Sequence, residues 1–167
     1  IPELRQAAAD YFSRTRGIQV DADDVVVGAG AKPFIGYTIQ SVTDHGAGDE
    51  VIYPVPGFPI YDSQIKANGA VGVPIYLRES RNFGFDPQEL ADKITPKTKL
   101  LILNSPQNPT GGIIPKTDLE AIAEILRKHP QVWVFADEIY GQLVYDGEFN
   151  SIASLPGMQE RTIISDG

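Results

Sequence analysis

The chain has 167 residues, of which 42% are hydrophobic and 22% are charged, a composition that indicates a globular protein and excludes wholesale disorder. Its formal net charge of −8, without any stripe of lysine and arginine, argues against nucleic acid as the main partner. The chain contains no cysteine, which excludes disulfides, thiolate metal sites and a cysteine nucleophile.

The first predicted element is a helix that begins with the chain. Pro2 suits the first turn of a helix, and Gly17 suits its end. The side chains that fall on one face of this helix are Leu4, Ala8, Tyr11 and Phe12.

Six short segments after this helix are predicted to be strands. They are β-branched or wholly apolar rather than alternating, which is typical of a sheet that is covered on both faces. These segments are Val25–Val27, Val51–Tyr53, Val71–Leu77, Leu100–Leu103, Val132–Ala136 and Thr162–Ile164.

Helical patterns separate several of these strands, and two of the helices carry start signals. Residues 86–89 and 117–120 both read as capping boxes, in which a side chain at each end of the first turn accepts a backbone N–H. The second helix has a stripe of residues expected to be buried, namely Leu119, Ile122, Ala123 and Leu126, and it is expected to end near His129-Pro130. Strands that alternate with helices form βαβ units, so we predict an α/β fold, a three-layer α/β/α sandwich with a mostly parallel central sheet.

The two ends of the chain lie inside predicted elements. A helix begins at the first residues, and the buried strand Thr162–Ser165 runs directly into Asp166-Gly167. We therefore expect residues 1–167 to be one part of a larger domain.

Metal and membrane sites are not expected. His45 and His129 lie far apart in the sequence and have no spacing of metal ligands. No apolar run approaches the length of a membrane span, and residues 1–5 do not read as a signal peptide. We expect a soluble cytoplasmic protein with no membrane partner.

In a parallel sheet the ligand lies beyond the carboxyl ends of the strands, so the residues that follow each strand matter most. Small residues, Gly28 to Pro33, follow the first predicted strand, and the rigid loop 104–112 follows the fourth. Asp137 and Tyr140 follow the fifth. Together these three segments outline one site.

The turn at residues 28–33 favours an anion, because its small residues expose backbone N–H groups at the start of a helix. It lacks the third glycine of a dinucleotide-binding turn, and Lys32 is not followed by the Ser or Thr of a P-loop. A tight turn without a ligand explains this segment equally well.

Asp137 and Asn108 each have a structural and a functional interpretation. A carboxylate at the end of a buried strand must be paired, so Asp137 either caps the next segment or binds a ligand cation such as a protonated heterocyclic nitrogen. Asn108 either forms an ordinary Asx turn or presents its amide from a loop that proline and glycine hold stiff.

The motifs in these loops resemble a known family. Residues 104–111, NSPQNPTG, followed by residues 137–140, DEIY, are similar to the NPTG and DEIY motifs of class I/II aminotransferases, which use pyridoxal 5'-phosphate (PLP) and have the aspartate aminotransferase fold. The segments IPELR, GDEV, PGFPIY and ITPKTK match the same pattern in order. The resemblance covers the whole chain but less than half of a typical family member.

The resemblance implies roles for seven residues. The turn residues Gly30, Ala31 and Lys32 would hold the cofactor phosphate, and Phe58 would stack on the pyridine ring. Three further side chains would bind polar atoms of the ring. Asp137 would pair with the ring nitrogen and keep it protonated, Tyr140 would donate to the phenolic oxygen, and Asn108 would bind that oxygen and lie near the substrate carboxylate.

The resemblance also implies an activity and what lies outside the chain. A family member transfers an amino group between an amino acid and a 2-oxo acid, acts as a homodimer, and binds PLP through a Schiff-base lysine. That lysine is expected just beyond Gly167, and none of the seven lysines of this chain matches it. The N-terminal arm and the small domain with its carboxylate-binding arginine are also expected to lie outside residues 1–167.

Two other functions share these motifs. One is a PLP-dependent lyase or synthase of the same fold, in which a different bond is broken. The other is an aminotransferase-like effector domain of a transcription regulator, which a basic winged-helix domain upstream would distinguish.

Overall fold

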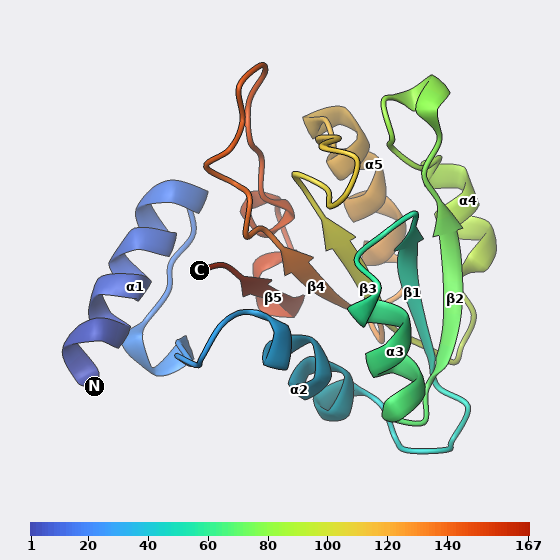
Figure 1. The fold of residues 1–167 in the computed structure, drawn as a ribbon, viewed down its shortest axis with the longest axis horizontal. Helices are drawn as coiled ribbons and strands as arrows, with labels where there is room; N and C mark the ends of the chain where they lie inside the picture. Colours follow the sequence, from blue (N-terminus) through green and yellow to red (C-terminus); the bar gives the residue numbers. More distant parts are fainter.

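The computed structural model describes all residues 1–167, and a five-stranded sheet forms its centre (Figure 1). The strands lie in the order β2-β1-β3-β4-β5, and every neighbouring pair is parallel. Their bounds are β1 Glu50–Val55, β2 Val71–Tyr76, β3 Thr98–Asn104, β4 Trp133–Asp137 and β5 Thr162–Ser165. The predicted parallel α/β sheet is confirmed.

Five α-helices surround the sheet. They are α1 Pro2–Arg16, α2 Lys32–Val42, α3 Ile60–Ala67, α4 Pro87–Lys93 and α5 Lys116–Arg127. None of them combines the length and the apolar character that a membrane-crossing helix needs.

The helices cover the two faces of the sheet and create two cores, as the non-alternating strands predicted. Alternate residues of β3 point to opposite faces: Leu101 and Leu103 pack with α4 and α5, and Leu100 and Ile102 pack with α2 and α3. The four predicted stripe residues of α5 are buried in the first core, namely Leu119, Ile122, Ala123 and Leu126. The three-layer arrangement is therefore confirmed.

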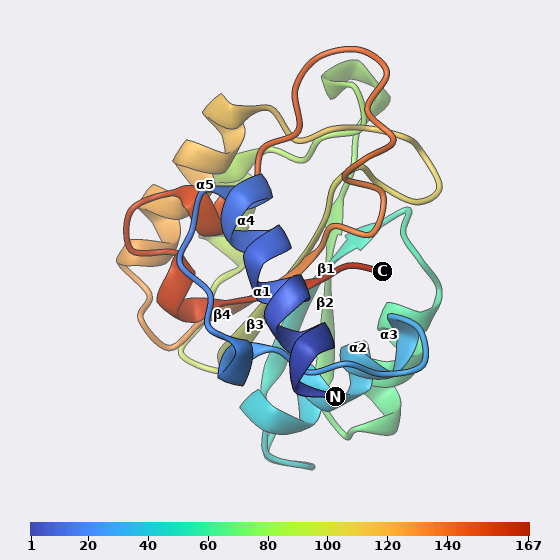
Figure 2. The same ribbon diagram turned by 90° about the vertical axis from the view of Figure 1, so that its left-hand side faces the viewer.

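Helix α1 lies apart from these two layers, beside the edge strand β5 (Figures 1 and 2). It ends at Gly17, as predicted. The predicted apolar face is only partly covered, since Leu4 is exposed, and the two residues of α1 that are buried are Ala9 and Arg16. A buried arginine at the end of a helix requires partners, and these are described below.

One predicted strand and both predicted capping boxes are not formed. Residues 25–27 do not form a strand, because no other strand lies beside them to complete a hydrogen-bond ladder, and Val26 and Val27 are exposed. Helix α5 starts at Lys116 with Pro115 as its cap, so Thr117 lies inside the helix and forms no capping box. At α4 the Asp86 side chain does accept the Gln88 N–H, but Glu89 binds Tyr76 N and Arg78 instead of closing the box.

Strand register aligns the carboxyl ends of three strands. Asn104 at the end of β3 pairs with Asp137 at the end of β4, which in turn pairs with Ser165 at the end of β5. The backbone therefore places three polar side chains in a row at one edge of the sheet.

Candidate functional site

A cavity of about 490 Å³ opens at this carboxyl edge, where a parallel sheet is expected to bind its ligand. All seven residues that the sequence singled out line it, from the turn at the start of α2, the β1–α3 loop, the β3–α5 loop, and the end of β4 with the loop that follows it. They are Gly30, Ala31, Lys32, Phe58, Asn108, Asp137 and Tyr140. The fold thus brings together residues that lie more than a hundred positions apart.

The turn before α2 forms one end of the cavity. The backbone N–H groups of Gly30, Ala31 and Lys32 donate no hydrogen bond within the chain. Gly30 has a φ of 80°, a left-handed conformation that favours glycine. Three free N–H groups at the positive end of an 11-residue helix make this turn suitable for an anion.

Two side chains stand beside the turn. The Lys32 Nζ lies 6.0 Å from the centre of the Phe58 ring and forms no ion pair with a carboxylate of this chain. Phe58 in turn meets Tyr61 edge to face, with ring centres 5.8 Å apart. A free cation and an apolar ring surface therefore face the same space.

The loop 104–112 is fixed by its own amides. Asn104 donates to the backbone oxygen of Asp137 at 3.0 Å, and its side-chain oxygen accepts the Asn108 N–H at 2.8 Å. Gln107 donates to the backbone oxygen of Pro56 at 2.9 Å and accepts from Thr110. These bonds hold Asn108 against the end of β4 and tie the loop to the segment that carries Phe58.

Asp137 is buried, with only one of its two oxygens bonded. The Tyr61 hydroxyl donates to Oδ2 at 2.6 Å, whereas Oδ1 is buried without any hydrogen-bond partner. Burial raises the pKa of Asp137, the hydrogen bond from Tyr61 and the nearby backbone N–H of Ile139 lower it, and the charge of Asp166 raises it again, for a net increase. An unpartnered buried carboxylate oxygen is costly, so a cationic donor in the cavity would be favoured here.

Sequence reasoning missed Tyr61 and gave Asn104 no role. Tyr61 is fully buried, and its pKa is raised by burial and by the neighbouring Asp137. Its hydrogen bond to Asp137 joins residues 76 positions apart, and no local motif signals such a pair. The position of Asn104 directly after a buried strand was the available signal for its role.

We expect Tyr61→Phe to destabilise the cofactor-free protein by about 1.5–3 kcal/mol at pH 8, because a charged acceptor loses its donor. The loss should shrink at acid pH. Without the Tyr61 donor the raised pKa of Asp137 increases further, so the penalty is present where Asp137 is ionised and fades as pH falls through its folded-state pKa. Denaturant unfolding of wild type and Tyr61→Phe, at pH 8 and at acid pH, measures how the stability loss depends on pH.

Tyr53→Phe is the matched control. The Tyr53 hydroxyl also donates to an aspartate, Asp62, but at 3.2 Å and outside the buried core. Its removal should change stability little at either pH. If Tyr61→Phe and Tyr53→Phe lower the free energy of unfolding equally at both pH values, the buried Tyr61–Asp137 hydrogen bond contributes no more to stability than the more exposed one.

The cavity as a whole has two complementary ends. Its N–H groups and Lys32 favour an anion, and the free oxygen of Asp137 favours a cation. A flat ring would lie between them against Phe58. The site is therefore suited to a planar molecule that carries a phosphate-like group and a protonated ring nitrogen, and the residues present fit PLP.

Comparison with known proteins places the chain in a family. The model of the aminotransferase class I and II family matches residues 1–165. The arginine–pyruvate transaminase of Pseudomonas aeruginosa is 42% identical over 95% of this chain and 40% of its own length. The aspartate aminotransferase of Geobacillus stearothermophilus is 38% identical over 100% of this chain and 42% of its own length.

Solved structures agree with these sequences. The aspartate aminotransferase of Thermus thermophilus, solved with maleate, matches at a TM-score of 0.94 with 36% identity, and the match covers 100% of this chain and 42% of that one. This chain thus spans about two fifths of the length of the relatives it matches. A family match over nearly every residue, with the same fold, shows that the chain belongs to the class I and II aminotransferases.

Proposed function

We propose that residues 1–167 are the cofactor-binding part of a PLP-dependent aminotransferase, which transfers an amino group between an amino acid and a 2-oxo acid. The observation that carries this proposal is the buried, unpartnered Oδ1 of Asp137 in the same cavity as three free backbone N–H groups. These groups suit the ring nitrogen and the phosphate of one molecule. The transaminases among the relatives support the same activity.

Each residue of the site would have a distinct task. The N–H groups of residues 30–32 and the Lys32 ammonium would bind the phosphate, and Phe58 would cover the ring. Asp137 would accept the hydrogen bond of the protonated ring nitrogen. When bound, PLP withdraws the electrons left by the broken Cα–H bond of the amino acid, most strongly while its ring nitrogen is protonated.

Asn108 and Tyr140 would orient the ring from its other side. Both side chains line the cavity, and Asn108 is held by the bond of its N–H to Asn104. We assign both to the phenolic oxygen of PLP, and Asn108 also to the neighbourhood of the substrate carboxylate. Tyr140 is 36% exposed, so it lies at the rim of the cavity where a substrate would enter.

The proposal also covers the lysine that binds PLP, the oligomeric state and the location of the enzyme. The chain spans about 42% of the aspartate aminotransferases it resembles, so the lysine that binds PLP would be supplied by polypeptide beyond Gly167. We propose that the active enzyme is a homodimer and that it is cytoplasmic. The family supports the homodimer and the position of the lysine.

Borohydride reduction of the longer polypeptide that contains this chain tests the proposal. We expect the PLP-loaded protein to absorb visible light, and reduction should abolish that band and attach the cofactor to a lysine beyond Gly167. Peptide mapping by mass spectrometry locates the label. A label on Lys32 would overturn the assignment of that residue to the phosphate, and a protein that binds no PLP would overturn the function.

A further inference from the structure

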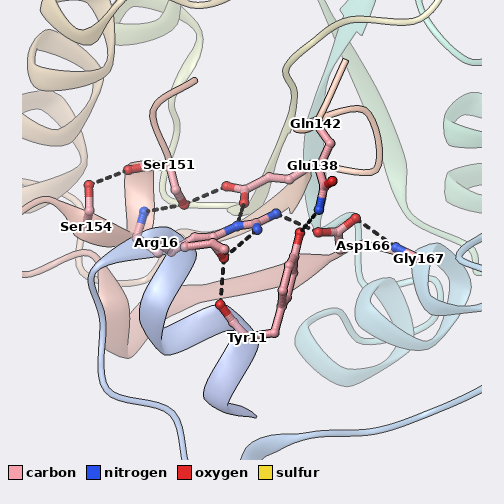
Figure 3. A network of polar contacts seen from close by, with 10 residues as sticks. Tyr11, Arg16, Glu138, Gln142, Ser151, Ser154, Asp166 and Gly167 are labelled. Carbon is pink, nitrogen blue, oxygen red and sulfur yellow. Dashed lines mark hydrogen bonds and ion pairs between the residues drawn. The ribbon is translucent and has the colours of Figure 1, made fainter. Parts of the chain in front are cut away.

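Arg16 is the most deeply buried cation in the chain, and it lies outside the cavity. Its guanidinium pairs with Glu138 at 3.0 Å and with Asp166 at 2.6 Å, and its remaining nitrogen donates to the Thr15 hydroxyl (Figure 3). The side chains of Arg16 and Glu138 are 3% and 4% exposed, respectively. All the hydrogen-bonding nitrogens of this guanidinium therefore have partners.

Aromatic rings from α1 itself and from the loop after β4 surround Arg16. Its guanidinium carbon lies 5.2–5.3 Å from the ring centres of Tyr11, Phe12 and Phe149. Burial lowers the pKa of Arg16, but the hydrogen bonds and the two carboxylates raise it above its usual value, so the residue stays charged. A group that is costly to bury has thus been enclosed by α1 and by the loop that follows β4.

Both carboxylates of this cluster adjoin the predicted cofactor site. Glu138 directly follows Asp137 in sequence, and Asp166 directly follows Ser165, which pairs with Asp137 across the sheet. The carboxyl ends of β4 and β5 therefore carry three carboxylates, Asp137, Glu138 and Asp166, and Arg16 binds the two that do not line the cavity.

We propose that Arg16 is a positioning residue for Asp137: its positive charge offsets one of the two negative charges of Glu138 and Asp166, and this keeps Asp137 ionised toward a protonated ring nitrogen. This inference rests on the proposed function. Without Arg16, three carboxylates would share one partly buried region, and their mutual repulsion would raise the proton affinity of each of them, Asp137 included.

The other charged groups near Asp137 do not replace Arg16. Tyr61 donates to Asp137 but is neutral, and Tyr140 lies at the rim of the cavity. Lys32 is a cation at the opposite, anion-binding end, beside Phe58. Ser151 donates to Glu138 at 2.6 Å, and the Gly167 N–H donates to Asp166, but neither carries a charge (Figure 3). Arg16 is the cation that pairs with carboxylates of this cluster, namely Glu138 and Asp166.

The position of the proton between Asp137 and the ring is the property that Arg16 should control. Glu138 and Asp166 lie beside Asp137 on the protein side of the cavity, so their unbalanced charge would raise the proton affinity of Asp137 more than that of the ring. The ring would lose its proton to Asp137. A change from a mostly protonated to a mostly neutral ring corresponds to about a hundredfold change in the ratio of the two forms, or about two pKa units.

The test uses the PLP-loaded longer polypeptide with PLP labelled with ¹⁵N at its ring nitrogen, whose chemical shift reports protonation. Wild type should show the protonated ring, and Arg16→Met should show mostly the neutral ring. Adding Asp166→Asn to Arg16→Met restores the net charge of the wild-type cluster, and it should restore the protonated signal although the ion pairs are still missing.

Arg161→Met is the matched control. Arg161 also makes several partly buried contacts, donating to the backbone oxygens of Leu126, His129 and Val132, but it lies just before β5, at the opposite end of the strand from Asp166. Its loss should lower the melting temperature and leave the ¹⁵N shift unchanged. If Arg16→Met does not fold, Arg16→Gln, which keeps a hydrogen-bond donor without the charge, gives the same measurement.

The outcomes separate the two proposals. A neutral ring in wild type would contradict the proposed role of Asp137 itself. A protonated ring in wild type and in both neutral Arg16 variants would overturn the role of Arg16 while leaving the function intact. A neutral ring that Asp166→Asn does not rescue would show that Arg16 acts through folding alone, which also overturns the inference.

Discussion

Replacing Asp137 by asparagine is expected to slow amino-group transfer by about a hundredfold or more per bound cofactor. The change removes the charge opposite the ring nitrogen and keeps the size of the side chain. PLP should stay bound, because the contacts of residues 30–32 and the covalent link to lysine remain. Single-turnover kinetics of the half-reaction, divided by the amount of bound PLP, measures the effect.

The Asp137→Asn variant should lose activity without losing stability. Burial raises the pKa of Asp137, so wild type without cofactor loses stability as pH rises from the unfolded-state pKa of an aspartate through the raised folded-state value. An asparagine at this position carries no such penalty, so the Asp137→Asn variant should be at least as stable as wild type at neutral pH. An aspartate whose role is only to stabilise the fold predicts the reverse: a lower melting temperature with normal turnover.

Two controls separate charge from shape in this experiment. PLP methylated at its ring nitrogen carries a permanent positive charge, and it should restore part of the lost rate in Asp137→Asn. Asp118→Asn removes a carboxylate that pairs with Arg81 away from the cavity, and it should leave the rate unchanged. Normal turnover per bound cofactor in Asp137→Asn would remove Asp137 from the mechanism.

Gly57→Ala should have the second largest effect. A Cβ at this position would lie 2.3 Å from the backbone oxygen of Pro54, so the segment that carries Phe58 must move. The same movement would strain the bond between Gln107 and the Pro56 oxygen. We expect a stability loss of about 1–3 kcal/mol and weaker PLP binding, measured by denaturant unfolding and by titration of the cofactor-free protein.

Gly36→Ala is the control for this variant. The added Cβ would meet the end of the flexible Gln64 side chain at 2.7 Å, which can move aside, and Gly36 lies within α2. Alanine favours a helix over glycine by about 0.5–1 kcal/mol, so this variant should be neutral or slightly more stable. If Gly57→Ala behaves in the same way, the β1–α3 loop is more adaptable than its backbone contacts indicate.

The sequence predicted the fold and the lining of the site because both depend on local patterns. Buried parallel strands read as short apolar runs, and the residues that follow them must gather at one edge of the sheet, as Asn108 and Asp137 do. Residues 30–32 reach the same cavity from the start of α2, with no strand before them. The one false strand, residues 25–27, shows the limit of this reasoning. An apolar run becomes a strand only where a neighbour supplies hydrogen bonds, and the run itself does not say whether one is present.

The supporting contacts could not be predicted in the same way. Tyr61 reaches Asp137 across 76 positions, and Arg16 reaches Glu138 across 122. Arg16 sits among polar residues near the end of an amphipathic helix, a pattern that usually indicates a solvated face. Only the docking of α1 against β5 turns it into a buried ion pair, and that docking leaves no periodic signal in the sequence.

A crystal structure of the longer polypeptide with PLP would test the central claim most directly. We predict that the ring nitrogen lies within hydrogen-bond distance of Oδ1 of Asp137, that the phosphate accepts from the N–H groups of residues 30–32, and that Phe58 covers the ring. A phosphate bound elsewhere, or a ring nitrogen that faces water while Oδ1 of Asp137 stays unpartnered, would contradict the account.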